Sequence, residues 1–204
     1  MLKCELLPAG QGVSTAVVRP AEQSEWGAIR DVLNLAYAQY VGDVAPEAWE
    51  RFRADLLDLD RHARHGRLLV ALVDGDVAGY AAFYPDAAAQ GLGWPAGWAG
   101  GRGLAVHPSR RGHGIAVALM AALEGCARAR GAPVFAFHTS SFMTSARALY
   151  ERLGYRRAPE FDLDLNSHYG VTAAPPWTAL AYLARVGAAR PESPQRRWRT
   201  EKAS

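Results

Sequence analysis

Residues 104–116 of this chain read LAVHPSRRGHGIA, and this stretch decides the fold. Three apolar residues end a predicted strand, Pro108 marks a corner, and an Arg-Gly-rich turn runs into an amphipathic helix. A helix N-terminus leaves backbone N–H groups unpaired and carries partial positive charge, so it can hold an anion. Gly112 and Gly114 would let the backbone approach a diphosphate, because glycine has no Cβ. A purely structural strand-to-helix corner is the alternative reading.

Two common phosphate-binding motifs do not fit this turn. A P-loop needs Gly-Lys followed by Ser or Thr, and neither Lys3 nor Lys202 follows a glycine. A dinucleotide-binding fingerprint needs a third glycine near position 117, where this chain has Val117. It also needs an array of βαβ units, which the order of elements below contradicts.

Apolar periodicity divides the rest of the chain into strands and helices. The continuous apolar run at 68–73 indicates a strand covered by helices on both faces, and Asp74-Gly75 is a hairpin turn. The first half of the chain is expected to form a strand at 14–19, a helix at 25–40 with Ser24 as N-cap, and a helix from Pro46 with Leu59 on its apolar face. Strands at 68–73, 77–84 and 98–106 follow, with a loop at 85–97 before the last of them. The second half is expected to form a helix at 115–131, a strand at 134–138, a helix ending at Gly154, and strands near 160–165 and 178–186. This order predicts a mixed α/β fold with a partly antiparallel sheet.

Composition limits the class of protein. The 204 residues suffice for one domain, no run approaches the ~18 apolar residues of a membrane span, and the start of the chain lacks a secretory signal. We therefore expect a cytoplasmic protein without a membrane partner. Cys4 and Cys126 offer neither a disulfide framework nor metal-ligand spacing, so no metal is expected, and Cys126 is predicted to pack in the core.

The net charge of +3 is too small to indicate a nucleic-acid partner. A loose leader at 1–13, a domain at 14–186 and a Pro- and Arg-rich tail at 187–204 are expected. The tail is predicted to be disordered, and its arginines make a nucleic-acid-associated protein the weaker alternative.

Two motifs, in order along the chain, resemble those of the GNAT superfamily, which transfers acyl groups from acyl-CoA to amines. The Arg-x-x-Gly-x-Ala spacing from Arg111 to Ala116 is similar to motif A of that family. Residues 146–155, ARALYERLGY, are similar to its later motif Ala-x-x-Leu-Tyr-x-x-x-Gly-Phe. The resemblance covers roughly residues 14–186. It implies a mostly antiparallel mixed sheet of about seven strands flanked by about four helices.

The resemblance also implies where acetyl-CoA, the expected co-substrate, would bind. Pantetheine would lie in a splayed gap between the fourth and fifth strands, and the turn amides would hold the diphosphate. The implied cofactor-binding residues are Leu104, Ala105, Val106, Arg111, Gly112, His113, Gly114, Ile115 and Ala116. The family often has an asparagine where this chain has Met143, so its hydrogen bond to pantetheine is either absent or supplied by Ser141 or Thr144.

Two residues are candidates for the chemistry. Tyr150 matches the tyrosine that many family members use as general acid, since a phenol with pKa ~10 can protonate a thiolate with pKa ~8.5. Packing on the apolar face of its helix is the alternative. The carboxylate base usual on the fourth strand is missing from residues 100–103. His138 is a candidate base, and a water relay is another solution.

Mostly aromatic residues are expected to wall the acceptor, namely Tyr37, Tyr40, Asp43 and Trp49 on one side and Trp94 and Trp98 on the other. Few carboxylates lie in this region, which disfavours a polycationic acceptor. The sequence predicts transfer of an acetyl group to a primary amine of a small molecule or peptide N-terminus, by direct attack on the thioester. A non-catalytic acyl-CoA-binding module is the alternative, and the last strands are a candidate homodimer interface.

Overall fold

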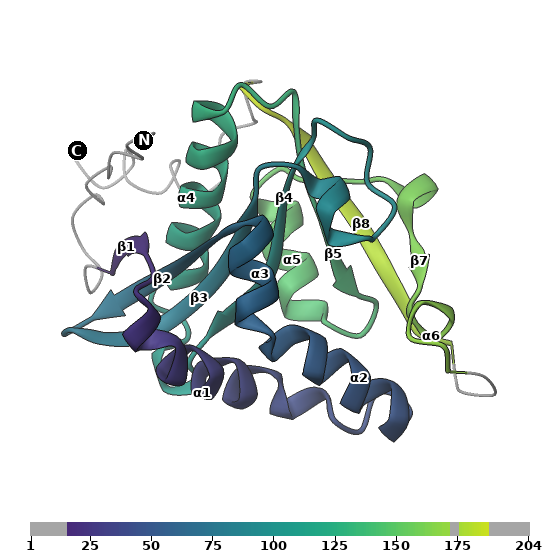
Figure 1. The fold of residues 1–204 in the computed structure, drawn as a ribbon, viewed down its shortest axis with the longest axis horizontal. Coiled ribbons are helices and arrows are strands. Elements are labelled where there is room, and N and C mark those ends of the chain that lie inside the picture. The colour runs from purple at the N-terminus through teal and green to yellow at the C-terminus, as the bar shows by residue number, and fades with distance from the viewer. Residues whose placement is uncertain (1–15, 172–175, 188–204) are drawn as a thin grey trace, which may run out of the picture.

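The computed structural model of the chain describes residues 16–171 and 176–187. Within them, eight strands form one sheet in the order β1-β2-β3-β4-β5-β8-β6, with β7 paired to β8 (Figure 1). The strands are β1 (Val17–Pro20), β2 (Arg67–Val73), β3 (Asp76–Tyr84), β4 (Ala99–Val106), β5 (Val134–Ser140), β6 (Arg156–Arg157), β7 (Leu163–Asp164) and β8 (Thr178–Arg185). β4 and β5 run parallel and the other pairs are antiparallel. The predicted mixed, mostly antiparallel fold class is confirmed.

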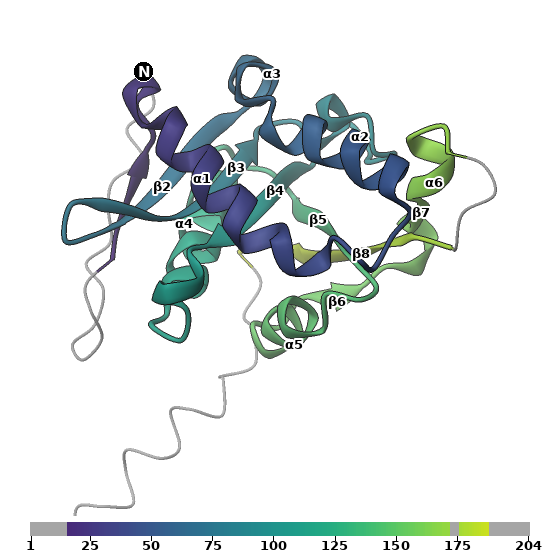
Figure 2. The same cartoon turned by 90° about the horizontal axis from the view of Figure 1, so that it is seen from below.

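Helices cover both faces of this sheet. The described residues form α1 (Trp26–Tyr37), α2 (Pro46–Leu57), α3 (Leu59–His65), α4 (Ile115–Ala129), α5 (Thr144–Arg152) and α6 (Leu165–His168). Figure 2 shows α1, α2 and α3 on one side of the sheet and α4 and α5 on the other. None of the helices in the described part of the chain is long and apolar enough to cross a bilayer.

The buried hairpin at β2 and β3 is confirmed. Leu68 and Val70 pack into the core under α1 to α3, whereas Leu69 and Ala71 pack into the core under α4. Alternate residues of a strand point to opposite faces, so a strand between two helical layers must be apolar throughout. Helix α4 likewise buries the predicted stripe, including Cys126, in the second core.

Local capping differs from the prediction in two places. Ser24 is not an N-cap, because it lies within a 3₁₀ turn in which Glu22 and Glu25 form a capping box. Leu59 does not continue α2. Helix α2 ends at Leu57, and Asp58 is the N-cap of α3, because its carboxylate accepts a hydrogen bond from the Arg61 N–H.

Smaller differences concern element ends. The expected loop at 85–97 contains a 3₁₀ turn at Ala87–Gln90, and α4 ends at Ala129. The strand near 160–165 is reduced to β7, because a 3₁₀ turn occupies Pro159–Phe161. The predicted leader at 1–13 and the tail after residue 187 lie outside the described residues.

Candidate active site

A gap between β4 and β5 organises the site. These strands pair only at Ala99 with Phe135 and Gly100 with Ala136 within the described residues, and beyond these pairs no ladder joins them. Residues 101–106 therefore run along β3 on one side and face the gap on the other. The splayed gap implied by the family resemblance is present in this form.

A bulge in β4 adjusts the backbone beside the gap. Tyr80 pairs with Ala105 and Ala82 with Arg102, so Gly103 and Leu104 together oppose one residue of β3. Gly103 has φ +67°, a conformation that glycine adopts without a Cβ penalty. A Cβ at this position would also lie 3.2 Å from the Tyr80 ring.

The backbone beyond the bulge presents an N–H group to the gap. The His107 N–H donates to the Ala78 carbonyl at 2.8 Å. Hydrogen-bonded and non-hydrogen-bonded pairs alternate along an antiparallel ladder, so the Val106 N–H points away from β3 and toward β5.

A cavity of about 770 Å³ occupies the gap and extends over both sides of it. Of the predicted cofactor-binding residues, eight line it: Leu104, Ala105, Val106, Arg111, Gly112, Gly114, Ile115 and Ala116. His113 does not, because its exposed ring turns back onto its own loop and its Nδ1 lies 2.8 Å from the Arg111 carbonyl. Gly114 is the N-cap of α4 at φ +78°, so the turn leads directly into the helix N-terminus.

Among the described residues, every charged side chain that lines the cavity is an arginine. Arg110 and Arg111 belong to the turn before α4, Arg152 is the last residue of α5, and Arg102 comes from β4. Arg111 reaches across to α1, where it donates to the Ala36 carbonyl at 3.1 Å. The electrostatics of this lining favour anions.

Met143, at the position where the family often has asparagine, lines the cavity as the N-cap of α5. The Thr139 hydroxyl donates to its sulfur at 3.7 Å. Neither Ser141 nor Thr144 lines the cavity, whereas Ser145 does. A polar substitute for the asparagine is therefore better placed at Ser145 than at either residue expected from the sequence.

Tyr150 both packs in the core and lines the cavity. Its side chain is 5% exposed, and its ring lies 4.5 Å from Phe137 and 5.8 Å from Tyr182 between centroids. Burial raises the pKa of Tyr150 well above the ordinary phenol value, so the hydroxyl keeps its proton at neutral pH.

His138 also lines the cavity, and its two ring nitrogens differ. Its Nε2 lies 2.8 Å from the Phe161 carbonyl, and because a carbonyl can only accept, Nε2 carries the proton. Its Nδ1 is therefore an acceptor, and it is buried with no partner among the described residues. Burial lowers the pKa of His138 to about 4, so the ring is neutral at pH 7.

The structure places two of the six residues expected to wall the acceptor on the cavity. Tyr37 and Tyr40 line it, but Asp43, Trp49, Trp94 and Trp98 do not. Trp94 is 4% exposed and stacks on His138 at 4.3 Å, so Trp94 and Trp98 belong to the apolar cluster behind that histidine. Other residues of the cavity wall come from three places. Leu92 precedes β4, Phe52 and Leu56 belong to α2, and Leu165 and Tyr169 follow β7.

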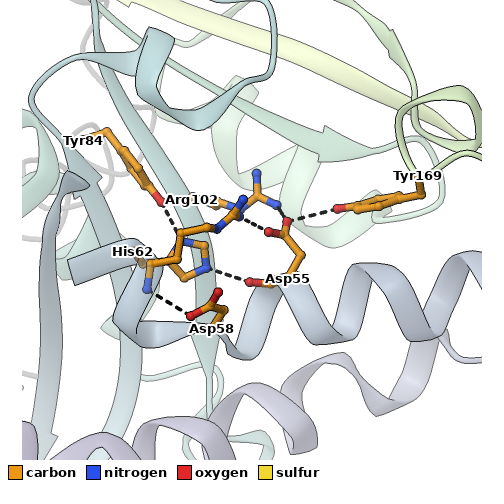
Figure 3. Close-up of polar contacts among 7 residues, drawn as sticks. Asp55, Asp58, His62, Tyr84, Arg102 and Tyr169 are labelled. Carbon is orange, nitrogen blue, oxygen red and sulfur yellow. Dashed lines mark hydrogen bonds and ion pairs between the residues drawn. The ribbon is translucent and has the colours of Figure 1, made fainter. Parts of the chain in front are cut away.

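A polar cluster that the sequence did not predict lies beside the cavity (Figure 3). The Asp55 carboxylate, from α2, forms ion pairs with Arg102 and Arg61 and accepts a hydrogen bond from the Tyr169 hydroxyl at 3.2 Å. His62 is 1% exposed, with Nε2 2.9 Å from the Asp55 carbonyl and Nδ1 2.5 Å from the Tyr84 hydroxyl. The cluster joins α2, α3, β3 and β4 at the floor of the site.

Comparison with known proteins decides the family. A model of the acetyltransferase (GNAT) family matches residues 26–155, which is more than half of the chain. The chain belongs to the GNAT family. It is therefore an acyl-CoA-dependent acetyltransferase with acetyl-CoA as co-substrate.

Solved GNAT structures share the fold of this chain. A GCN5-related N-acetyltransferase from Rhodopseudomonas palustris is 19% identical with TM-score 0.61, covering 87% of this chain and 99% of that one. The ribosomal-protein-S18-alanine N-acetyltransferase from Escherichia coli is 16% identical with TM-score 0.60, covering 87% and 98%. The PaiA N-acetyltransferase from Thermoplasma acidophilum, solved with coenzyme A, is 12% identical with TM-score 0.63, covering 84% and 99%. At these identities the likeness concerns the fold.

This GNAT site contains residues that local sequence patterns did not single out. Asp55 lies 47 residues from Arg102, and nothing in the helical pattern of α2 points to that pairing. Arg102 did carry a signal, since it is a lone charge among glycines and apolar residues in a buried strand. In the described part of the chain, no group of three or more His, Cys, Asp or Glu side chains is arranged to hold a metal ion.

Proposed function

We propose that this GNAT enzyme transfers the acetyl group of acetyl-CoA to a primary amine by direct attack on the thioester, with Tyr150 as general acid. The observation that carries the proposal is the position of Tyr150. Its buried, protonated side chain lines the same cavity as the diverging end of β4 and the turn before α4.

The residues around the gap suit acetyl-CoA. The pantetheine arm, which carries amide groups, would pair with the free side of the β4 backbone at Leu104 to Val106. The diphosphate would bind the turn amides at Gly112 to Ala116 and the N-terminus of α4. Arg110 and Arg111, which belong to this turn and line the cavity, would add positive charge at that end.

The proposed reaction proceeds through a tetrahedral intermediate. The amine nitrogen attacks the thioester carbon, a C–N bond forms, and negative charge develops on the carbonyl oxygen. The Val106 N–H, which points into the gap, would donate to that oxygen. Collapse of the intermediate breaks the C–S bond, and the Tyr150 hydroxyl would protonate the departing thiolate.

The attacking amine must lose a proton, and the surroundings of His138 define its part in this step. With a pKa of about 4, His138 is a weak base, although it is neutral at pH 7. We assign its unpartnered Nδ1 the task of accepting a hydrogen bond from the amine and orienting it. The amine proton itself would pass to water, as in the relay expected from the sequence.

Calorimetric titration with acetyl-CoA tests whether the protein binds the cofactor as proposed. Micromolar binding that Arg111→Ala weakens at least tenfold would support the cofactor site. Thiol release during incubation with a panel of small amines and peptides tests whether the acetyl group is transferred. Binding without thiol release from any acceptor would instead favour the non-catalytic acyl-CoA-binding module.

A further inference from the structure

Three residues that line the cavity each carry a buried nitrogen atom with no hydrogen-bond partner among the described residues. These atoms are Nε2 of Gln90, Nε of Arg102 and Nδ1 of His138. Gln90 is 7% exposed, and only 12% of the Arg102 side chain is exposed. Buried polar groups are nearly always hydrogen-bonded, so three unpaired ones on one cavity point to a ligand that pairs with them.

These three atoms lie on the same face of the sheet. Gly100 and Arg102 are two residues apart on β4, so they point to one face, as do Ala136 and His138 on β5. Gly100 pairs with Ala136 on β5 and with Tyr84 on β3, and because Tyr84 packs in the core under α1 to α3, both sets lie on that side of the sheet. Gln90 joins them there, because a Cβ on Gly100 would overlap the Gln90 amide nitrogen.

The chemistry of the three atoms is complementary to an amino acid. The Gln90 and Arg102 nitrogens are donors, and a carboxylate accepts from two such donors at once. The His138 Nδ1 is an acceptor, and an amine N–H can donate to it. One ligand that carries a carboxylate close to its amine would satisfy all three.

Charge in the cavity supports the same class of ligand. None of the carboxylates in the described part of the chain lines the cavity, and Asp55 is shared by two guanidinium groups, so its one negative charge does not neutralise both. A second positive charge on the acceptor would be repelled by Arg102, whereas a carboxylate would be attracted. Much of the remaining lining on this side is apolar or aromatic, including Phe52, Leu56 and Leu92, although Ser140 on β5 is polar.

We propose that the acceptor is a free amino acid with an apolar side chain, whose carboxylate binds Gln90 and Arg102 while its amine faces His138. This inference rests on the proposed acetyl transfer. The product would be the N-acetyl amino acid, with the amine proton released and the thiolate protonated to the free thiol of CoA. A peptide N-terminus lacks a carboxylate beside its amine and would leave the two donors unpaired.

Matched acceptors test the proposal with the native enzyme. We would measure kcat/KM by thiol release for L-leucine, L-leucinamide, 3-methylbutylamine and the peptide Leu-Gly-Gly, and repeat the first three in the phenylalanine series. Loss of a charged hydrogen-bonding group from a buried site predicts at least a 100-fold preference for the free amino acid. Equal rates, or a preference for the amide or the peptide, would overturn the proposal.

Variants then locate the carboxylate. Gln90→Leu removes a donor at similar volume, and Arg102→Lys keeps a cation for Asp55 but loses the planar guanidinium. Each is expected to raise the KM for leucine about tenfold or more and to leave the KM for 3-methylbutylamine nearly unchanged. Arg64→Lys, an exposed position on α3, is the matched control. Equal effects on both acceptors would show a structural role and contradict the assignment.

The proposal and the acetyl transfer on which it rests can fail separately. Thiol release from amines without preference for the carboxylate would remove only the amino-acid acceptor. If no acceptor releases thiol, the acetyl transfer fails, and titration of the CoA-bound protein still decides the ligand. Leucine must then bind more tightly than 3-methylbutylamine, and the reverse order would overturn the proposal.

Discussion

Tyr150 is packed in the core and also lines the cavity. Phe137, Tyr155 and Tyr182 surround its ring, so the orientation of the side chain is set by the core. The same burial that holds the ring raises the pKa of its hydroxyl, which keeps the proton available for a leaving thiolate. Packing and general-acid function are therefore compatible at this position.

Tyr150→Phe is expected to lower kcat for thiol release by roughly 10²-fold or more, because it removes the proton donor and leaves the ring in place. Acetyl-CoA affinity, measured by calorimetry, should change little. Tyr182→Phe is the matched control, since its hydroxyl bonds Glu151 at 2.8 Å and the residue does not line the cavity. An unchanged kcat in Tyr150→Phe would exclude this tyrosine as the acid.

Two histidines predict how stability depends on pH. Burial lowers the pKa of His62 to about 3 and that of His138 to about 4, below the ordinary value near 6.5. Between the lowered pKa of each folded histidine and the ordinary value near 6.5, the unfolded chain binds more protons than the folded one. The free energy of unfolding therefore falls as the pH drops from 6.5 toward 4. Over the range from pH 6.5 to 4, each histidine contributes on the order of 3 kcal/mol to this fall in the free energy of unfolding.

Urea unfolding between pH 7.5 and 4 measures this effect. His138→Gln should flatten the decline, and His62→Gln should flatten it independently, although both variants start from lower stability at pH 7. The exposed His65→Gln serves as a control. A decline of the same size in all three variants would assign it to carboxylates instead.

At the scale of elements, β4 is shaped by its departures from a regular strand. It pairs with β5 over two residues, bulges at Gly103 and turns into α4 through Gly114. Each departure frees backbone groups that a regular ladder would consume, and these groups face the cavity. In the proposed complex, β4 would bind the cofactor through its main chain, which requires no special side chain at Leu104 or Ala105.

Gly103→Ala is expected to destabilise the protein by about 1–3 kcal/mol, because alanine resists a positive φ and its Cβ would press on the Tyr80 ring. It should also weaken acetyl-CoA binding by displacing the N–H groups of residues 104–106. Gly27→Ala in α1 is the matched control. No atom lies within 4 Å of its added Cβ, so stability should stay constant or rise slightly. Equal behaviour of the two variants in urea unfolding and calorimetry would refute the role of the bulge.

At the scale of the whole molecule, the Asp55 cluster ties the helical layer to the sheet. Asp55 belongs to α2, while its partners come from α3, β4 and the residue after α6. The carboxylate and Arg102 are largely withdrawn from water, with side chains 13% and 12% exposed, whereas Arg61 is 40% exposed. Removing the shared carboxylate leaves a buried cation without its counter-charge.

Asp55→Asn should therefore lower the free energy of unfolding by about 2–4 kcal/mol, as is typical when one partner of a buried ion pair is lost. Arg61→Ala, which removes the more exposed partner, should cost about 1 kcal/mol or less. Denaturant titrations of both variants provide the comparison. Equal losses would mean that the surface pair, and not the buried one, holds these elements together.

The elements with local signals were predictable from the sequence alone. The β2–β3 hairpin and the strand–turn–helix corner at residues 104–116 follow from the apolar period and the turn residues. These features depend on neighbours within a few residues, so the physical information lies in the stretch itself. The place of Tyr150 and the nine cofactor-binding residues were instead implied by the family resemblance, and Tyr150 and eight of those nine line the cavity.

Tertiary structure decided which distant groups meet. The stacking of Trp94 on His138, the pairing of Asp55 with Arg102 and the approach of Gln90 to Gly100 join segments with no shared periodicity. An aromatic or charged residue in a loop or on a helix is compatible with several packings, and only the complete sheet selects one. The sequence therefore determined the fold and the turn before α4, whereas chain packing determined the surroundings of His138, Arg102 and Gln90, because contacts there depend on how whole layers come together.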